Sequence, residues 1–248
     1  MLFSFHKKRS ETAMSEKYET IVPSEPDAGE RLQWVSWLRS AAPYVHLHHG
    51  RTFVISFAGE VVADRTLLNH LVMDVSLIAS MGMRVVLVHG SRPQIEELMS
   101  LRKLEGQFYK GVRITGPQEL ECVKEACGET RFDIEAAFSQ GLPNTPMQHS
   151  RIKVVSGNFV TAPPMGIIDG VDYLHTGVVR KVDAESIQDL LSRGNIVLVS
   201  PTGFSPTGEA FNLTTEDVAT AIAVAIHADK LILSVGVDGV RIQGEKQQ

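Results

Sequence analysis

The chain has 248 residues, of which 43% are hydrophobic and 21% charged, and 24 Lys and Arg stand against 29 Asp and Glu for a formal net charge of −5. This composition is typical of a globular protein and excludes a disordered or collagen-like chain. Without a surplus of positive charge, a nucleic-acid-binding protein is not expected. The length suits one large α/β domain or two smaller ones.

Nothing in the sequence predicts export or a membrane span. The short apolar start, residues 1–6, is followed by the basic residues 7–9, which reverses the order of a secretory signal. The apolar stretch 218–226 is far shorter than the ~20 residues that cross a bilayer. Cys122 and Cys127 are too few for a disulfide framework, and their spacing turns them away from each other on a helix. We therefore expect a reduced, cytoplasmic protein without a membrane partner.

The N-terminal region divides into a predicted flexible tail over residues 1–29 and a helix over 30–44. Apolar residues recur at three- and four-residue steps from 30 to 42, and Pro43 is expected to end the helix. Trp34 and Trp37 lie on this element. A helix that carries two tryptophans is either a lid on the core or a contact between subunits. Because tryptophan is enriched at interfaces, we favour an oligomerisation helix. The main domain then covers residues 45–248.

Strand-like and helix-like segments alternate along the main domain. Strands are predicted at 52–57, 84–88, 152–155, 196–199 and 231–235. Helices are predicted at 66–80, after Pro93, at 184–192 and at 215–228, and a small hairpin is expected around 162–170. Apolar strands that alternate with amphipathic helices predict an α/β three-layer sandwich with a mainly parallel sheet.

Three predicted strands end in loops with glycine or small residues, namely 56–60, 89–93 and 200–203. In open α/β sheets, ligands bind beyond the carboxyl ends of the strands. Glycine lets backbone N–H groups approach an anion, and a following helix N-terminus favours negative charge. Each glycine could instead serve a tight turn alone. The three loops together favour a shared crevice for an anionic ligand.

Other chemistries find little support in the sequence. Gly203 and Gly208 have the spacing of a phosphate-binding P-loop, but Glu209 and Ala210 occupy the positions that require Lys and Ser or Thr. The histidines before the first strand are interpreted as a solvated loop, so no metal is expected; they are His46, His48 and His49. No nucleophile-elbow motif supports a hydrolase triad.

Several motifs together resemble the amino-acid kinase fold of the acetylglutamate kinases, at residues 54–59, 88–95, 111–115 and 212–219. Further segments make the chain more similar to the kinase-like N-terminal domain of the bacterial N-acetylglutamate synthase family. These segments are 37–43, the Arg92-Pro93-Gln94 variant of the second loop, 175–183 and 206–213. The resemblance covers roughly residues 30 to 240.

Departures from the kinase pattern argue against phosphoryl transfer. The resemblance places Ser56 where the kinases have a strand lysine, and Glu216 where they have an aspartate that organises the catalytic lysines. Loss of one preorganised transition-state contact costs about 10²–10³ in rate, so no catalytic residue is expected in this chain.

A ligand pocket is expected to persist without the chemistry. Asn212 and Arg113 match positions that hold the amino-acid substrate in the kinases, although Arg113 could instead form a surface salt bridge. The candidate ligand-binding residues are Gly59, Gly90, Ser91, Arg92, Arg113 and Asn212.

The resemblance implies a role in the first step of arginine biosynthesis, in which acetyl passes from acetyl-CoA to L-glutamate. In the family a further acetyltransferase domain performs this reaction. That domain is not found in this chain, which is expected to be truncated within its kinase-like domain and to expose a sheet edge. The chain itself is then a non-catalytic arginine-sensing and assembly domain, with L-arginine as effector, no bound cofactor and a homo-oligomeric state. The alternatives are an ATP-dependent acetylglutamate kinase and a binding module without enzyme activity.

Overall fold

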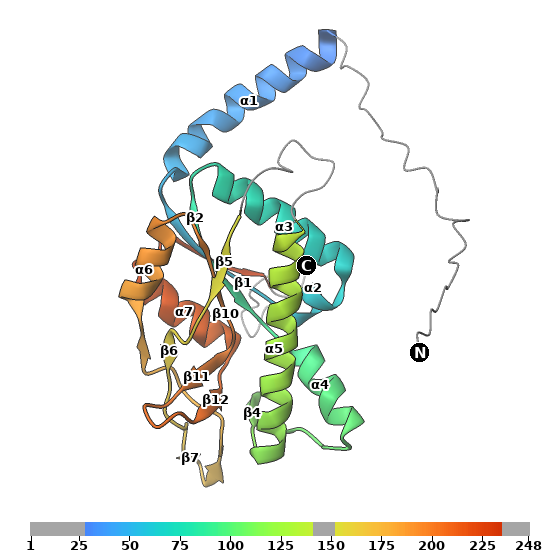
Figure 1. Ribbon diagram of the computed structural model, residues 1–248, viewed down its shortest axis with the longest axis vertical. Coiled ribbons are helices and arrows are strands. Elements are labelled where there is room, and N and C mark those ends of the chain that lie inside the picture. The colour runs from blue at the N-terminus through green and yellow to red at the C-terminus, as the bar shows by residue number, and fades with distance from the viewer. Residues whose placement is uncertain (1–27, 141–151, 235–248) are drawn as a thin grey trace, which may run out of the picture. The chain divides into compact units, whose positions relative to one another are not determined.

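The computed structural model describes residues 28–140 and 152–234 (Figure 1). The chain divides into two compact units, Met1–His46 and Leu47–Gln248. No helix in these two described ranges combines the length and apolar character needed to cross a membrane. Most of the predicted tail and the predicted strand residue Val235 lie outside the described ranges.

Helix α1 (Ala28–His48) contains Pro43, so the predicted helix end at that proline is wrong. Proline removes only its own N–H from the hydrogen-bond ladder, and the residues that follow can keep theirs. The predicted loop is wrong for His46 and His48, which belong to α1. His49 lies in the turn after the helix and is exposed, as predicted, and its Nδ1 lies 3.0 Å from the carbonyl oxygen of Met81. Within the described ranges, no three or more His, Cys, Asp or Glu residues are grouped to hold a metal ion.

Two tryptophans project from α1 into solvent. The side chains of Trp34 and Trp37 are 65% and 60% exposed, and their rings meet edge to face with centroids 6.4 Å apart. Leu32, Val35 and Leu38 on the same helix are exposed as well. Helix α1 therefore carries several exposed apolar side chains.

A five-stranded parallel sheet forms the centre of the second unit, in the order β13-β1-β2-β10-β5. Its strands are β1 (Thr52–Phe57), β2 (Arg84–His89), β5 (Val154–Ser156), β10 (Ile196–Val199) and β13 (Lys230–Ser234). All five predicted strands are present, with β5 starting two residues later than expected. The parallel sheet confirms the predicted fold class.

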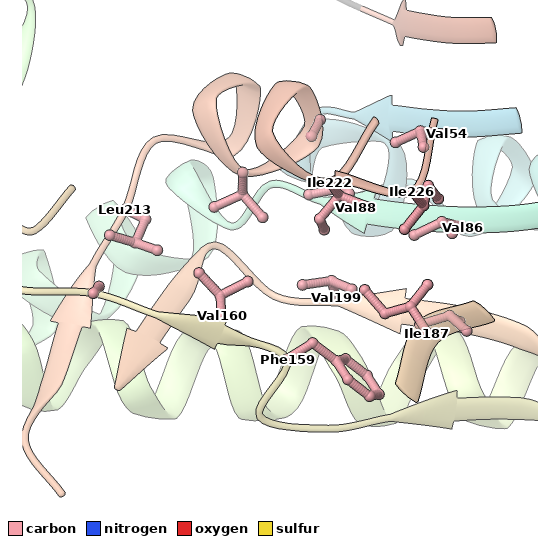
Figure 2. Close-up of a cluster of buried hydrophobic side chains, with 14 of the residues drawn as sticks. Val54, Val86, Val88, Phe159, Val160, Ile187, Val199, Leu213, Ile222 and Ile226 are labelled. Atoms are coloured by element: carbon pink, nitrogen blue, oxygen red, sulfur yellow. The ribbon is translucent and has the colours of Figure 1, made fainter. Parts of the chain in front are cut away.

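Helices cover both faces of this sheet. They are α3 (Arg65–Ser80), α5 (Pro117–Ser139), α6 (Ala184–Ser192) and α7 (Thr215–Ala225). Alternate residues of each strand point to opposite faces. Val54 and Val86 pack with Ile187 of α6 and Ile222 of α7 (Figure 2), whereas their strand neighbours pack with α3 and α5. The result is the predicted three-layer sandwich.

Shorter elements surround the carboxyl ends of the central strands. They are α2 (Gly59–Ala63), α4 (Arg92–Leu101), the hairpin β3 (Gln107–Tyr109) and β4 (Val112–Ile114), and the hairpin β7 (Ile167–Ile168) and β8 (Val171–Asp172). A second sheet has the order β12-β11-β6-β9, formed by β6 (Val160–Thr161), β9 (Lys181–Val182), β11 (Thr202–Phe204) and β12 (Ala210–Asn212). The β7–β8 hairpin overlaps the predicted one.

Candidate functional site

A cavity of about 470 Å³ opens at the carboxyl ends of β1 and β2. All six candidate ligand-binding residues line it: Gly59, Gly90, Ser91, Arg92, Arg113 and Asn212. They come from two strand-end loops, from the β3–β4 hairpin and from β12. The cavity also includes Phe108, Thr176 and the residues that begin α7, Thr214–Glu216. The structure therefore gathers segments that are far apart in the sequence around one space.

The first two loops meet closely because both contain glycine. The N–H of Gly90 donates to the carbonyl oxygen of Phe57 at 2.7 Å. A Cβ atom on Gly90 would lie 3.0 Å from the backbone N of Gly59, and one on Gly59 would lie 2.6 Å from Oε1 of Gln94. Nε2 of Gln94 in turn donates to the carbonyl oxygen of Gly59 at 2.8 Å. These glycines therefore serve close packing that shapes the cavity wall.

The third loop does not join the cavity as predicted. Of residues 200–203 only Pro201 lines it, and the next element is strand β11 rather than a helix. Gly203 packs instead against Ala162, the residue that follows β6, since a Cβ on Gly203 would lie 2.5 Å from that of Ala162. The prediction of three converging strand-to-helix loops is thus wrong for this loop, because the hairpin β11–β12 intervenes before α7. The start of α7 takes its place.

Arg113 is a buried cation at the wall of the cavity. Its side chain is 8% exposed, and its guanidinium lies 4.6 Å from the centre of the Phe108 ring. Nη2 lies 3.3 Å from Oε1 of Glu96. Burial lowers the pKa of Arg113 and Glu96 opposes that shift, but an arginine side chain stays protonated in proteins. Arg113 does form the salt bridge of the alternative, with the half-exposed Glu96, but its guanidinium is buried at the cavity wall and not at the surface.

A second arginine faces the same aromatic ring. The guanidinium of Arg92 lies 5.3 Å from the ring centre of Phe108, and its Nε donates to Oε1 of Glu96 at 2.9 Å. Glu96 therefore contacts two arginines with one carboxylate, which leaves net positive charge on this side of the cavity. Two further acidic residues, Glu60 and Glu216, also line the space. The cavity thus presents charges of both signs.

Hydroxyl groups that the sequence alone did not single out hold Asn212 in place. Nδ2 of Asn212 donates to Oγ1 of Thr115 at 3.0 Å. The hydroxyl of Thr176 donates to the carbonyl oxygen of Arg113 at 2.6 Å, and its oxygen lies 2.8 Å from Oγ1 of Thr115. Thr115 falls within a motif that resembles the acetylglutamate kinases and Thr176 within one that resembles the synthase family, but their buried positions follow only from the tertiary structure. The network links the β4 segment to β12.

His89 connects the second loop to the end of β10. Its Nδ1 lies 3.2 Å from the carbonyl oxygen of Gly90, and its Nε2 lies 2.9 Å from the hydroxyl oxygen of Ser200. A carbonyl can only accept, so Nδ1 carries the proton and Nε2 accepts from Ser200. Burial lowers the pKa of His89 to about 4, which keeps the ring neutral at pH 7. This neutral imidazole fixes the loop that carries Gly90 and Ser91.

Comparison with known proteins identifies the class. The model of the amino acid kinase family matches residues 51–248, and the chain belongs to this family. An amino-acid acetyltransferase from Ralstonia nicotianae is 59% identical over 215 residues, which are 87% of this chain and 48% of the relative. One from Ectopseudomonas mendocina is 50% identical over 207 residues, 84% of this chain and 48% of that protein. The chain spans about half the length of these relatives.

Solved structures agree with this assignment. N-acetylglutamate synthase from Neisseria gonorrhoeae, in complex with coenzyme A and L-arginine, matches with a TM-score of 0.79 and 32% identity over 86% of this chain and 50% of that one. The same enzyme with coenzyme A and N-acetyl-glutamate matches with a TM-score of 0.76 and 33% identity over 85% of this chain and 47% of that one. These findings confirm the resemblance to the synthases and the fold class.

Proposed function

We propose that this chain is the regulatory and assembly part of an N-acetylglutamate synthase and that its large cavity binds an amino-acid ligand without transforming it. The observation that carries the proposal is the gathering of Arg92, Arg113, Glu60 and Glu216 around one space of about 470 Å³. A ligand with charges of both signs complements such a lining. Amino acids are the simplest ligands of this kind.

The geometry suggests how the ligand is oriented. Arg113 is buried, and its five N–H donors match a carboxylate better than an ammonium group of lysine would. The first turns of α4 and α7, which begin at Arg92 and Thr215, add a favourable field for negative charge. The carboxylates of Glu60 and Glu216 then suit the cationic end of the ligand. L-arginine is the proposed effector, in line with the arginine that the gonococcal synthase binds.

A competing function is the phosphorylation of N-acetyl-L-glutamate by ATP, which the amino acid kinase family match favours. Phosphoryl transfer depends on cations that stabilise the charge of the transferred group. Ser56 on β1 is 5% exposed and lies between Val88 and Leu233 in the sheet. Among the described residues that line the cavity there is no lysine. The site therefore supports binding better than it supports a kinase reaction.

We propose acetyl transfer from acetyl-CoA to L-glutamate as the function of a full-length protein. This chain spans only about half the length of the relatives it matches. We assign none of the catalytic residues of that reaction to residues 45–248. The exposed Trp34 and Trp37 on α1 support an assembly role for the N-terminal helix. We place the assembled homo-oligomer in the cytoplasm.

Two activity assays test this proposal on the purified chain. We expect no ADP from ATP, Mg²⁺ and N-acetyl-L-glutamate in a coupled assay, and no release of coenzyme A from acetyl-CoA and L-glutamate. ADP formation that depends on N-acetyl-L-glutamate and is lost in Asn212→Ala would establish the kinase function instead. Coenzyme A release that depends on L-glutamate would show that the chain itself is catalytic.

A further inference from the structure

A second, smaller cavity of about 230 Å³ lies beside the ends of β5 and β10, and it shares no lining residue with the first. Its walls come from α5, from the segment between β5 and β6, and from β10 with the start of β11. The lining residues are Arg131, Ser156, Gly157, Asn158, Val160, Leu198, Val199, Ser200, Thr202 and Phe204. Apart from Ser200, whose hydroxyl contacts His89, none of them has a role in the function proposed above.

Arg131 supplies a cation with unused hydrogen-bonding capacity. Its Nε atom is buried and has no hydrogen-bond partner among the described residues. The nearest acidic group, Oε1 of Glu135, lies 3.7 Å away, which is too far for a hydrogen bond. That oxygen instead accepts from the hydroxyl of Ser156 at 2.7 Å. A buried donor without a partner is costly, and an acceptor in the cavity would remove that cost.

The remaining walls divide into a polar and an apolar part. Besides Arg131, the polar groups are the hydroxyls of Ser156, Ser200 and Thr202 and the exposed amide of Asn158. The apolar part comes mainly from Phe204, which is 39% exposed; Val160, Leu198 and Val199 also line the cavity but are at most 2% exposed. A bare inorganic anion would leave this apolar part without a partner. A ligand with a charged head and a short hydrocarbon chain satisfies both parts.

We propose that this second cavity binds a small aliphatic carboxylate, with its carboxylate on Arg131 and its hydrocarbon chain against the apolar walls. The planar guanidinium matches a carboxylate in shape and charge. A single cation, partly offset by Glu135, favours one negative charge over two. The volume lies below the ~300–1,000 Å³ of pockets for drug-sized ligands, so the chain of the ligand must be short.

A titration by nuclear magnetic resonance tests this proposal on the intact chain. Sodium butyrate is added at constant ionic strength, and the amide signals of Gly157, Asn158 and Thr202 are followed. We expect saturable shifts with butyrate, none with neutral butyramide, and weaker binding of inorganic phosphate. Saturation that is equally strong with butyramide, or stronger with phosphate, would overturn the proposal.

Matched variants assign the binding to Arg131. Arg131→Gln should weaken butyrate binding by about tenfold or more, because the charged hydrogen bonds to the carboxylate are lost. Arg193→Gln removes an equal charge at the C-terminal end of α6, where the side chain is 69% exposed, and should bind as the wild type does. Asn158→Asp adds a negative charge at an exposed position of the cavity wall and should abolish binding. Unchanged affinity in Asn158→Asp and Arg131→Gln would contradict the assignment.

Discussion

The backbone N–H of Gly90 donates a hydrogen bond over 2.7 Å to the carbonyl oxygen of Phe57, and it joins the ends of the neighbouring strands β2 and β1. The contact leaves no room for a side chain, since a Cβ on Gly90 would meet the N atom of Gly59 at 3.0 Å and Cα of Ala58 at 3.3 Å. Backbone atoms cannot rotate away as side chains do. The proposed ligand cavity therefore depends on this approach of two loops.

Gly90→Ala should destabilise the protein by about 1–3 kcal/mol, because the loops must move apart to accept the methyl group. Gly128→Ala is a matched control in α5, where a Cβ would meet nothing within 4 Å. Removal of a helical glycine should stabilise the protein by about 0.5–1 kcal/mol. Urea unfolding of both variants measures these changes. Equal stability of the two variants would show that the loop contact is not tight.

Local patterns in the sequence were sufficient to predict most strands and helices of the fold. The predicted bounds of β1 and α6 are confirmed, because a short run of β-branched and aromatic residues marks a strand buried on both faces, and the apolar spacing marks the buried face of the helix. Helix α5 was not predicted, since its buried face uses small or polar residues such as Cys122, Ala126 and Thr130. Such residues give a weak apolar period even where they are fully buried.

Tertiary placement could be predicted only in part for the candidate site. The loops around Gly59 and Gly90 follow adjacent parallel strands, so their meeting can be expected from sheet topology. The loop with Gly203 has the same local composition but continues into a hairpin, which local sequence does not distinguish from a turn before a helix. The contacts of Thr115 and Thr176 join segments 61 residues apart, and no short-range pattern predicts them.

The buried guanidinium of Arg113 should carry more of the ligand affinity than the exposed one of Arg92. Arg113→Gln is expected to weaken binding of the amino-acid ligand about tenfold or more, because a charge-assisted contact is lost. Arg92 is 69% exposed and shares the partner Glu96, so Arg92→Gln should have a smaller effect. Calorimetric dissociation constants of both variants make the comparison. A larger loss of ligand affinity in Arg92→Gln than in Arg113→Gln would contradict the proposed position of the ligand.

The neutral state of His89 should make stability depend on pH. Its pKa is about 4 in the folded protein against 6.5 when unperturbed, so the unfolded chain binds a proton first as the pH falls. Stability is therefore lost as the pH falls from about 6.5 to about 4, by about 2 kcal/mol between pH 7 and pH 5.

The variant His89→Gln isolates this dependence. Its amide can donate to the carbonyl oxygen of Gly90 and accept from Ser200, but it does not titrate. Urea unfolding at pH 7 and at pH 5 should show that the wild type loses more stability than the variant does. Parallel pH profiles of the two proteins would refute a buried neutral imidazole.

The exposed aromatic residues of α1 should matter for assembly rather than for folding. Trp34 and Trp37 are 65% and 60% exposed, so replacing both with alanine should leave the unfolding midpoint nearly unchanged. Loss of two large apolar side chains from a subunit contact should reduce the oligomer size. Size-exclusion chromatography with light scattering compares the double variant with the wild type. An unchanged mass would count against the assembly role.

Calorimetric titration of the chain with L-arginine, N-acetyl-L-glutamate and ATP tests the central claim most directly. The mixed charges of the cavity lining predict saturable heat with L-arginine in the absence of ATP. The same heat should be strongly reduced in Arg113→Gln. Tight binding of ATP, without binding of either amino-acid ligand, would contradict the account and favour a nucleotide-dependent function.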